Sequence, residues 1–122
     1  MTVDLTRPWP PSTNSLWRNV SVGGSQRTLL SAKAREFLDA AAQLVAQQRA
    51  GLRIKGAAEV WVTLHAPTRR GYDIDNRVKA LLDACTHGGL WHDDGQVDVL
   101  VVKRGDVIRG GAALLTVSEI EE

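Results

Sequence analysis

Aspartates gather at the two ends of one short segment in the second half of this chain. They are Asp73 and Asp75 at its start, and Asp93 and Asp94 at its end. In an extended chain, residues i and i+2 point to the same side with Cα atoms roughly 6.5 Å apart, so the first pair can present its carboxylates together. Asp94 can join them if the chain folds back. Carboxylates about 4 Å apart repel by roughly 4 kcal/mol at an effective dielectric of about 20, so such a cluster calls for a proton or a cation.

The donor set of Asp73, Asp75 and Asp94 favours magnesium. Carboxylate oxygens in that number, with no cysteine or histidine pair close by, suit a hard ion such as Mg²⁺ or Mn²⁺ better than zinc. Lys79, one helical turn after Asp75, is placed beside the same acids. The pattern alone leaves a second interpretation open, in which Asp75 caps a helix and the other acids belong to loops, turns or structural ion pairs.

A short helix is expected between the two acid pairs. Apolar residues recur there at the i, i+3, i+4 and i+7 spacing of one helical face: Val78, Leu81, Leu82 and Cys85. Asp75 stands where an N-cap is expected, and Gly88 or Gly89 where the helix should end. Cys85, the only cysteine, is expected to be a buried small hydrophobic residue rather than a nucleophile.

A strand is expected to position the first acid pair. Residues 57–66 alternate between apolar and polar side chains, which predicts a strand with Val60, Val62 and Leu64 facing the core. The chain then passes through a basic loop to Asp73. The acids therefore lie where a strand leads into a helix.

The remaining elements are predicted from periodicity and turn residues. A short strand is expected over residues 2–6, and a long helix from the Ser31 cap to Gly51. Its buried face comprises Phe37, Leu38, Ala41, Leu44 and Val45. Residues 97–102 and 112–117 are expected to be two strands that pair antiparallel with each other and extend the sheet.

Together these elements predict an α+β fold, with a mixed or antiparallel sheet of about four strands and two main helices. The chain has 122 residues, which predicts one domain over residues 1–122. The N-terminus lacks the pattern of a signal peptide, and no apolar run approaches the ~20 residues of a membrane span. We therefore expect a cytoplasmic protein with no membrane association.

Two stretches of the sequence resemble the RusA family of Holliday-junction resolvases, small endonucleases common in prophages. One consists of Asp73-Ile74-Asp75-Asn76, Lys79 and Asp83, followed by Trp91-His92-Asp93-Asp94 and Val97. The other runs from Pro10 to Arg18 and resembles the family's opening P-P-S-x-N-x-x-W-R. The resemblance covers both ends of the chain and nearly its whole length.

This resemblance implies a Mg²⁺-dependent crossover junction endodeoxyribonuclease. The family's essential acids fall on Asp73, Asp75 and Asp94, and its essential lysine falls on Lys79. Membership implies a homodimer that cuts opposing strands of a four-way DNA junction in recombination and repair. The alternative is a phage regulatory or architectural protein that binds junctions or DNA without cutting, with a carboxylate cluster of structural use.

The expected reaction is hydrolysis of a DNA phosphodiester by metal-activated water, with one or two Mg²⁺ ions on the three acids. Lys79 would neutralise charge on the phosphate or the leaving oxygen. Three further residues are assigned supporting roles: Asn76, Asp83 and Asp93. Of these, Asp83 could hold Lys79 at i+4. His87 and His92 remain alternatives as general bases.

The distribution of charge favours contact with phosphates. The net charge is only +1, but residues 1–79 hold 12 Lys or Arg against 6 Asp or Glu, and residues 80–122 hold 3 against 8. Cations that flank a carboxylate cluster attract a phosphate despite the negative charge of the acids. The residues expected to bind DNA are Arg69, Arg70, Tyr72, Arg77, Asn14 and Arg18.

Overall fold

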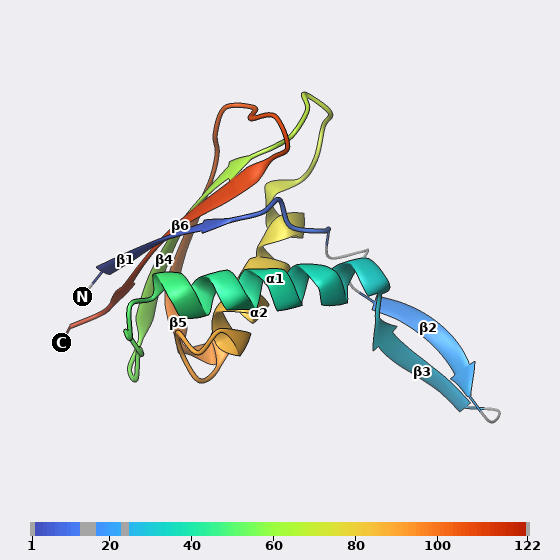
Figure 1. The fold of residues 1–122 in the computed structure, drawn as a ribbon, viewed down its shortest axis with the longest axis horizontal. Coiled ribbons are helices and arrows are strands. Elements are labelled where there is room, and N and C mark those ends of the chain that lie inside the picture. Colours follow the sequence, from blue (N-terminus) through green and yellow to red (C-terminus); the bar gives the residue numbers. More distant parts are fainter. Residues whose placement is uncertain (1, 13–16, 23–24, 122) are drawn as a thin grey trace.

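The computed structural model describes residues 2–12, 17–22 and 25–121; for residues 2–3, 7, 17–22 and 25–30 it describes the backbone alone. A four-stranded mixed sheet forms one layer, and two helices pack against it (Figure 1). The strands lie in the order β1 (Thr2–Arg7), β6 (Ala112–Glu119), β4 (Ala58–His65) and β5 (Val97–Arg104). The predicted α+β class, with about four strands and two main helices, is confirmed.

Strand β4 lies inside the sheet and carries much of the core. It pairs antiparallel with β6 on one side and parallel with β5 on the other. Its alternate residues are buried, and Val60, Val62 and Leu64 are all at most 1% exposed. The prediction that these three side chains face the core is confirmed.

The predicted pairing of the last two strands with each other is wrong. Strands β5 and β6 lie on opposite sides of β4, and neither pairs with the other. The physical reason is that β4, with one fully apolar face, fills the centre of the sheet, where both of its edges are paired. The sequence of the last two strands shows two half-buried elements but does not show which neighbour each one takes.

The parallel pairing of β4 and β5 requires a crossover connection, because parallel strands cannot be joined by a tight turn. Residues 66–96 form this crossover. It contains a 3₁₀ turn, η2 (Ile74–Arg77), then helix α2 (Val78–His87) and a second 3₁₀ turn, η3 (Asp94–Gln96). All four aspartates of the chemically interesting segment therefore lie on one crossover.

Helix α1 (Ala32–Gln48) forms as predicted. Ser31 caps it, and its Oγ accepts a hydrogen bond of 3.2 Å from the Ala34 amide. The buried face comprises Ala34, Phe37, Leu38, Ala41 and Val45. Of the predicted face, only Leu44 is half-buried rather than buried.

Helix α2 packs against α1 through its predicted apolar face. Val78, Leu81 and Cys85 are buried, whereas Leu82, the fourth predicted member of this face, is half-buried. The thiol takes part in no disulfide, as expected for a small core residue. Gly88 ends the helix, as one of the two predicted glycines; a Cβ there would overlap the Val45 side chain of α1. This close approach of the two helices requires glycine at the position.

The predicted helix cap at Asp75 is wrong. Asp75 lies inside the 3₁₀ turn η2, and α2 begins only at Val78, without a side-chain cap. The tighter 3₁₀ turn occupies the residues that would otherwise be the first turn of the helix. The Asp75 carboxylate is therefore not used to start α2.

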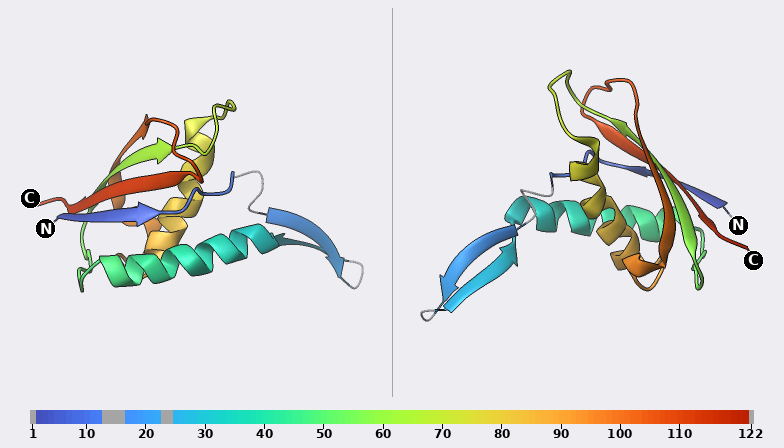
Figure 2. Two further views of the ribbon diagram at one scale, coloured as in Figure 1. Left: turned by 45° about the horizontal axis from the view of Figure 1, so that its top comes forward. Right: turned by 180° about the vertical axis from the view of Figure 1, so that it is seen from behind.

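A two-stranded hairpin, β2 (Trp17–Val22) and β3 (Ser25–Leu30), was not predicted. It pairs antiparallel and projects away from the main sheet (Figure 1, Figure 2). The sequence suggested only a turn near its tip, of which Gly23 and Gly24 lie outside the described residues. Among the described residues, no helix has the length and apolarity needed to cross a membrane.

Candidate active site

A lysine and two aspartates meet on one face of α2. Lys79 Nζ lies 3.0 Å from Asp83 Oδ1 and 3.4 Å from Asp94 Oδ2. Lys79 and Asp83 are one helical turn apart, and this contact was predicted. Asp94 arrives from η3, so the chain does fold back after the glycines. One ammonium group therefore joins an aspartate of α2 to an aspartate of η3.

The Asp94 carboxylate is held by two neutral donors as well. The Thr86 hydroxyl donates a hydrogen bond to Asp94 Oδ1, and Trp91 Nε1 lies 3.3 Å from the same oxygen. Trp91 Nε1 also donates to Thr86 Oγ1 at 2.7 Å. These contacts fix the direction in which the carboxylate points.

Thr86 was not among the residues predicted to form the site. The signal was present, because Thr86 follows Asp83 at i+3 and therefore lies on the helix face that carries Lys79 and Asp83. Trp91 was quoted only as part of a motif. Its indole N–H joins two side chains from different elements, a contact that spacing alone does not reveal.

The pKa values of the two carboxyl groups in the cluster are shifted in opposite directions. Burial raises the pKa of Asp94, but hydrogen bonds from Thr86, Asp83 and Trp91 and the charge of Lys79 outweigh it, so the pKa lies below its ordinary value. Burial raises the pKa of Asp83, and the neighbouring Asp94 adds to this despite Lys79. The hydrogen bond to Asp83 raises the pKa of Lys79. Of the two carboxyl groups, Asp94 therefore has the lower pKa.

Asp73 and Asp75 are placed differently. Both side chains are exposed, and Asp73 directly precedes η2 without capping it. Neither takes part in an ion pair with any residue that the structure describes. Across the same residues, no group of three or more His, Cys, Asp or Glu side chains is arranged to hold a metal ion. The shared metal site of Asp73, Asp75 and Asp94 stays a prediction.

Asp93 shapes the turn that carries Asp94. Its Oδ1 accepts a hydrogen bond of 2.9 Å from the Gly95 amide, and Gln96 Oε1 accepts one of 3.0 Å from the Asp93 amide. This is a capping box around η3. Gln96 Nε2 then donates to the Ile54 carbonyl at 2.8 Å, which ties the turn to the rest of the domain.

A pocket of about 250 Å³ opens beside this cluster. It is lined by Lys79, Asp83, Thr86, His87, His92, Asp93 and Asp94. Both histidines thus reach the same space as the lysine, and their alternative role as general bases stays a prediction. Asn76 donates its backbone N–H to the Asp73 carbonyl at 3.2 Å within η2.

Arg77, expected to bind DNA, is partly committed to the fold. Its Nη1 donates to the Pro10 carbonyl at 2.9 Å, and its guanidinium lies 5.3 Å from the Trp9 ring centroid. Desolvation by burial lowers its pKa, with Tyr72 acting in the opposite direction. These contacts fasten the N-terminal segment to the start of α2, and contact with DNA stays a prediction.

The other expected DNA contacts divide into two groups. Arg69 and Arg70 are exposed in the loop after β4, and the half-buried Tyr72 ends that loop. Asn14 lies outside the described residues, and the Arg18 side chain does too, although its backbone belongs to β2. Contact of these residues with DNA stays a prediction.

Arg104, at the end of β5, was not among the predicted site residues. Its Nη2 donates to the Tyr72 carbonyl at 2.8 Å, and its guanidinium lies 4.7 Å from the centroid of the Tyr72 ring. The Tyr72 ring also meets Trp9 edge to face, with centroids 5.1 Å apart. Each of these two aromatic rings thus has an arginine over it, Arg104 at Tyr72 and Arg77 at Trp9.

Comparison with known proteins connects this geometry to a family. The family model described as endodeoxyribonuclease RusA matches residues 8–115. The chain is 36% identical over 120 residues to the crossover junction endodeoxyribonuclease RusA of Escherichia coli K12, which covers 98% of this chain and 96% of that protein. Proteins with the same description from Enterobacteria phage 82 and Shigella sonnei are 36% and 35% identical over the same length.

Proposed function

This chain belongs to the RusA family of crossover junction endodeoxyribonucleases, and on this premise we propose that it cuts Holliday junctions at the site around Lys79 and Asp94. One observation carries the choice of site: Lys79 joins Asp83 of the same helix to Asp94, 15 residues away along the chain. A cation placed among carboxylates is the arrangement that can receive a phosphate and also restrain the acids.

The donor chemistry fits a hard divalent ion. Nucleases of this family are generally metal-dependent. The candidate ligands are the oxygens of Asp73, Asp75 and Asp94, of which the first two are exposed and without an ion pair among the described residues. Mg²⁺, or Mn²⁺ in its place, prefers such oxygens. A bound ion would polarise the scissile phosphate and lower the pKa of a water ligand.

The chain's own residues have separate tasks in this proposal. Lys79 neutralises the charge that develops on the phosphate or the leaving oxygen, and Asp83 restrains its ammonium group. Thr86 and Trp91 hold the Asp94 carboxylate in one orientation. The capping box of Asp93 stabilises the η3 turn, and this keeps Asp94 oriented towards α2. Asn76 supports the turn that carries Asp75.

Binding of the junction is assigned to the basic residues that precede and follow the first acid pair. Arg69, Arg70 and Tyr72 belong to the loop after β4, and Arg77 belongs to η2. Asn14 and Arg18 are proposed to contact DNA from the N-terminal motif. A homodimer would place two such sites on one junction, which paired nicks on opposing strands require.

The direct test is incubation of the purified protein with a mobile four-way junction and Mg²⁺, with linear duplex of the same sequence as the control. We expect paired, symmetry-related nicks in the junction and none in the duplex. The proposal would be wrong if the protein bound junctions and left every strand intact at every Mg²⁺ and Mn²⁺ concentration. Mass measurement in solution tests the homodimer.

A further inference from the structure

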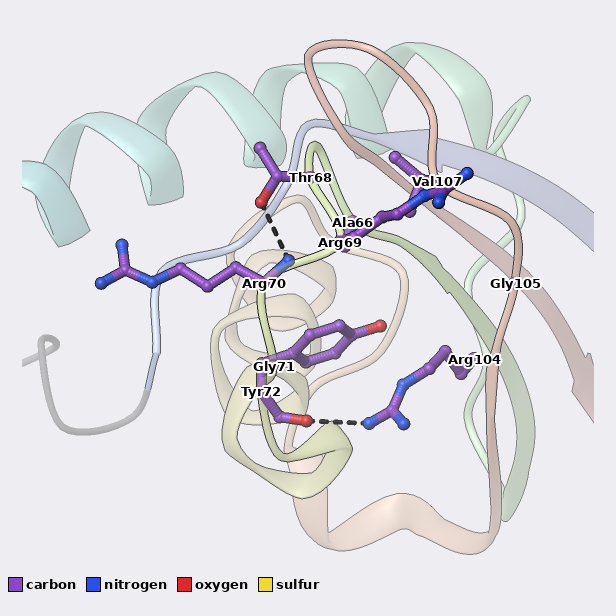
Figure 3. A pocket seen from close by; sticks show the side chains of 9 residues that line it. All are labelled: Ala66, Thr68, Arg69, Arg70, Gly71, Tyr72, Arg104, Gly105 and Val107. Carbon is purple, nitrogen blue, oxygen red and sulfur yellow. Dashed lines mark hydrogen bonds between the residues drawn. The ribbon is translucent and has the colours of Figure 1, made fainter.

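A second pocket is lined in part by the residues that directly precede Asp73 in the sequence, whereas α2 follows Asp73. Its volume is about 310 Å³, near the lower limit of roughly 300–1,000 Å³ that is usual for ligand sites. The loop of residues 66–72 forms one wall, and residues 104–107 form the other (Figure 3). Tyr72, the last residue of the first wall, directly precedes Asp73.

The position of this pocket in the fold is one where ligands commonly bind. Its two walls begin where the parallel strands β4 and β5 end, at His65 and Arg104. The space outside the carboxyl ends of parallel strands is the usual location of ligand sites in sheets that contain them. Here it is also the place where the crossover with the acids begins.

The charge of the pocket is opposite to that of the acidic cluster. Three arginines line it, Arg69, Arg70 and Arg104, and no aspartate or glutamate does. By contrast, the pocket beside α2 holds three aspartates and one lysine. An arginine-lined pocket suits a phosphate, because the planar guanidinium presents several N–H donors to its oxygens.

Arg104 links this pocket to the first acid pair. Its guanidinium donates a hydrogen bond of 2.8 Å to the Tyr72 carbonyl. A guanidinium has five N–H donors, so others are available to a ligand. Since Tyr72 precedes Asp73, this hydrogen bond restrains the backbone next to the acid.

The Tyr72 hydroxyl is the second observation that indicates a ligand. Its oxygen is buried and has no hydrogen-bond partner among the described residues. A buried hydroxyl is normally paired, so an unpaired one at a pocket calls for an explanation. Figure 3 shows this hydroxyl pointing to the same side as the Arg69 and Arg104 side chains, whereas Arg70 extends the other way.

We propose that this pocket binds one backbone phosphate of the cut DNA strand, a different phosphate from the one that is hydrolysed. Arg104, Arg69 and the Tyr72 hydroxyl are its donors, and Arg104 is a positioning residue that couples this phosphate to Asp73. The inference rests on the proposed function for its DNA substrate. It goes further by naming a second phosphate subsite and a residue, Arg104, that the sequence did not indicate.

The test combines protein variants with neutral phosphates. Four-way junctions carry a single methylphosphonate at each position flanking the cut, and binding is measured in EDTA so that no cleavage is required. For the parent protein, one flanking methylphosphonate should weaken binding about tenfold, as loss of a charge-assisted contact does. Arg104→Ala should bind unmodified junctions about tenfold more weakly than the parent does. The methylphosphonate at that one position should then weaken the binding of this variant no further.

Two further variants make the result specific. Arg109→Ala removes an exposed arginine of the same loop that does not line the pocket, and it should respond to every methylphosphonate as the parent does. Tyr72→Phe keeps the ring that packs on Trp9 and removes only the hydroxyl, so it should share part of the Arg104 effect at the same phosphate. Loss of one phosphate contact should also reduce the salt slope of binding by about 0.7–0.9.

The outcomes separate this inference from the proposed function. If the losses of binding affinity from Arg104→Ala and from the methylphosphonate multiply at every position, no phosphate occupies the pocket. This conclusion would hold even if the protein cuts junctions. If they fail to multiply at one position, the subsite stands, even when Mg²⁺ produces no nicks. Tyr72→Phe gives the same decision if Arg104→Ala does not fold.

Discussion

The acids that precede helix α2 and the acid that follows it are in contrasting states. Near the C-terminal half of α2, Asp94 accepts hydrogen bonds from Thr86 and Trp91 and pairs with Lys79. At the N-terminal end, the exposed Asp73 and Asp75 make no ion pair with any described residue. The fold therefore fixes one half of the site through side chains and the other half only through its backbone.

This difference shows how a small domain tolerates several like charges. Where the carboxylate is partly buried, donors and an ammonium group compensate the cost of desolvation. Where the carboxylates are exposed, water does so, and they stay available to an incoming cation. The restraint on the exposed pair comes from Arg104, which holds the Tyr72 carbonyl, and from the η2 turn itself.

The largest expected effect is on junction cleavage, and it compares the acid before α2 with the acid after it. Asp75→Asn and Asp94→Asn should each reduce junction cleavage by about 10²–10³, the range for loss of one key electrostatic group. Only Asp94→Asn should also lower the free energy of unfolding, by about 1 kcal/mol, because only Asp94 loses an ion pair within the protein. Single-turnover cleavage and urea denaturation measure the two effects.

Asp39→Asn, an exposed acid on α1, is the control and should change neither quantity. Equal destabilisation by the Asp75 and Asp94 variants would remove the contrast between the two ends. Parental cleavage by Asp75→Asn would exclude Asp75 from the catalytic set.

Removal of the ammonium group should have the next largest effect. Lys79→Ala should reduce cleavage about 100-fold, because the charge that opposes the developing phosphate charge is lost. Junction binding should change by no more than about threefold, since one partly screened cation is removed. Lys33→Ala on α1 is the matched control. A loss of binding as large as the loss of cleavage would make Lys79 a docking residue instead.

A smaller effect is expected when the orientation of Asp94 is relaxed. Thr86→Val keeps the shape of the side chain but cannot donate to Asp94 or accept from Trp91. Cleavage should fall about 10–100-fold, the range for residues that orient metal ligands. Thr86→Ser restores the hydroxyl and should recover most of the activity. Equal activity of the two variants would show that the hydroxyl plays no part.

The smallest expected effect is on stability at alkaline pH. The pKa of Lys79 is raised in the folded protein, chiefly by the Asp83 hydrogen bond, above its ordinary value of 10.5. Its contribution to stability is therefore fully present below pH 10.5 and is lost as the pH rises through the higher folded pKa. Urea denaturation from pH 8 upward should show a steeper alkaline loss for the parent than for Lys79→Met. Parallel curves would contradict this.

Much of the fold follows from local patterns in the sequence. Ser31 and the apolar face of α1 specify that helix, and the alternation of Val60, Val62 and Leu64 specifies β4. The pairing of β5 and β6 was predicted wrongly, because a half-buried strand pattern is the same whichever strand lies beside it. The β2 and β3 hairpin was missed because residues 17–30 lack a clear alternation of apolar and polar side chains.

The candidate site divides in the same way. The predicted contact between Lys79 and Asp83 is present, since i and i+4 residues meet on any helix. The predicted cap at Asp75 failed because a 3₁₀ turn precedes α2. Neither Thr86 nor Arg104 was selected, because each acts through a partner brought close by the fold.

The sequence by itself determined which chemical groups this protein has, the helix face that carries Lys79, and the family whose motifs it shares. The tertiary structure alone decided that Asp94 meets Lys79 and Thr86, and that Arg104 reaches Tyr72 from a strand 32 residues away. The physical reason is that periodicity specifies which face of an element is buried. Which elements then bury their faces together depends on the packing of the whole chain.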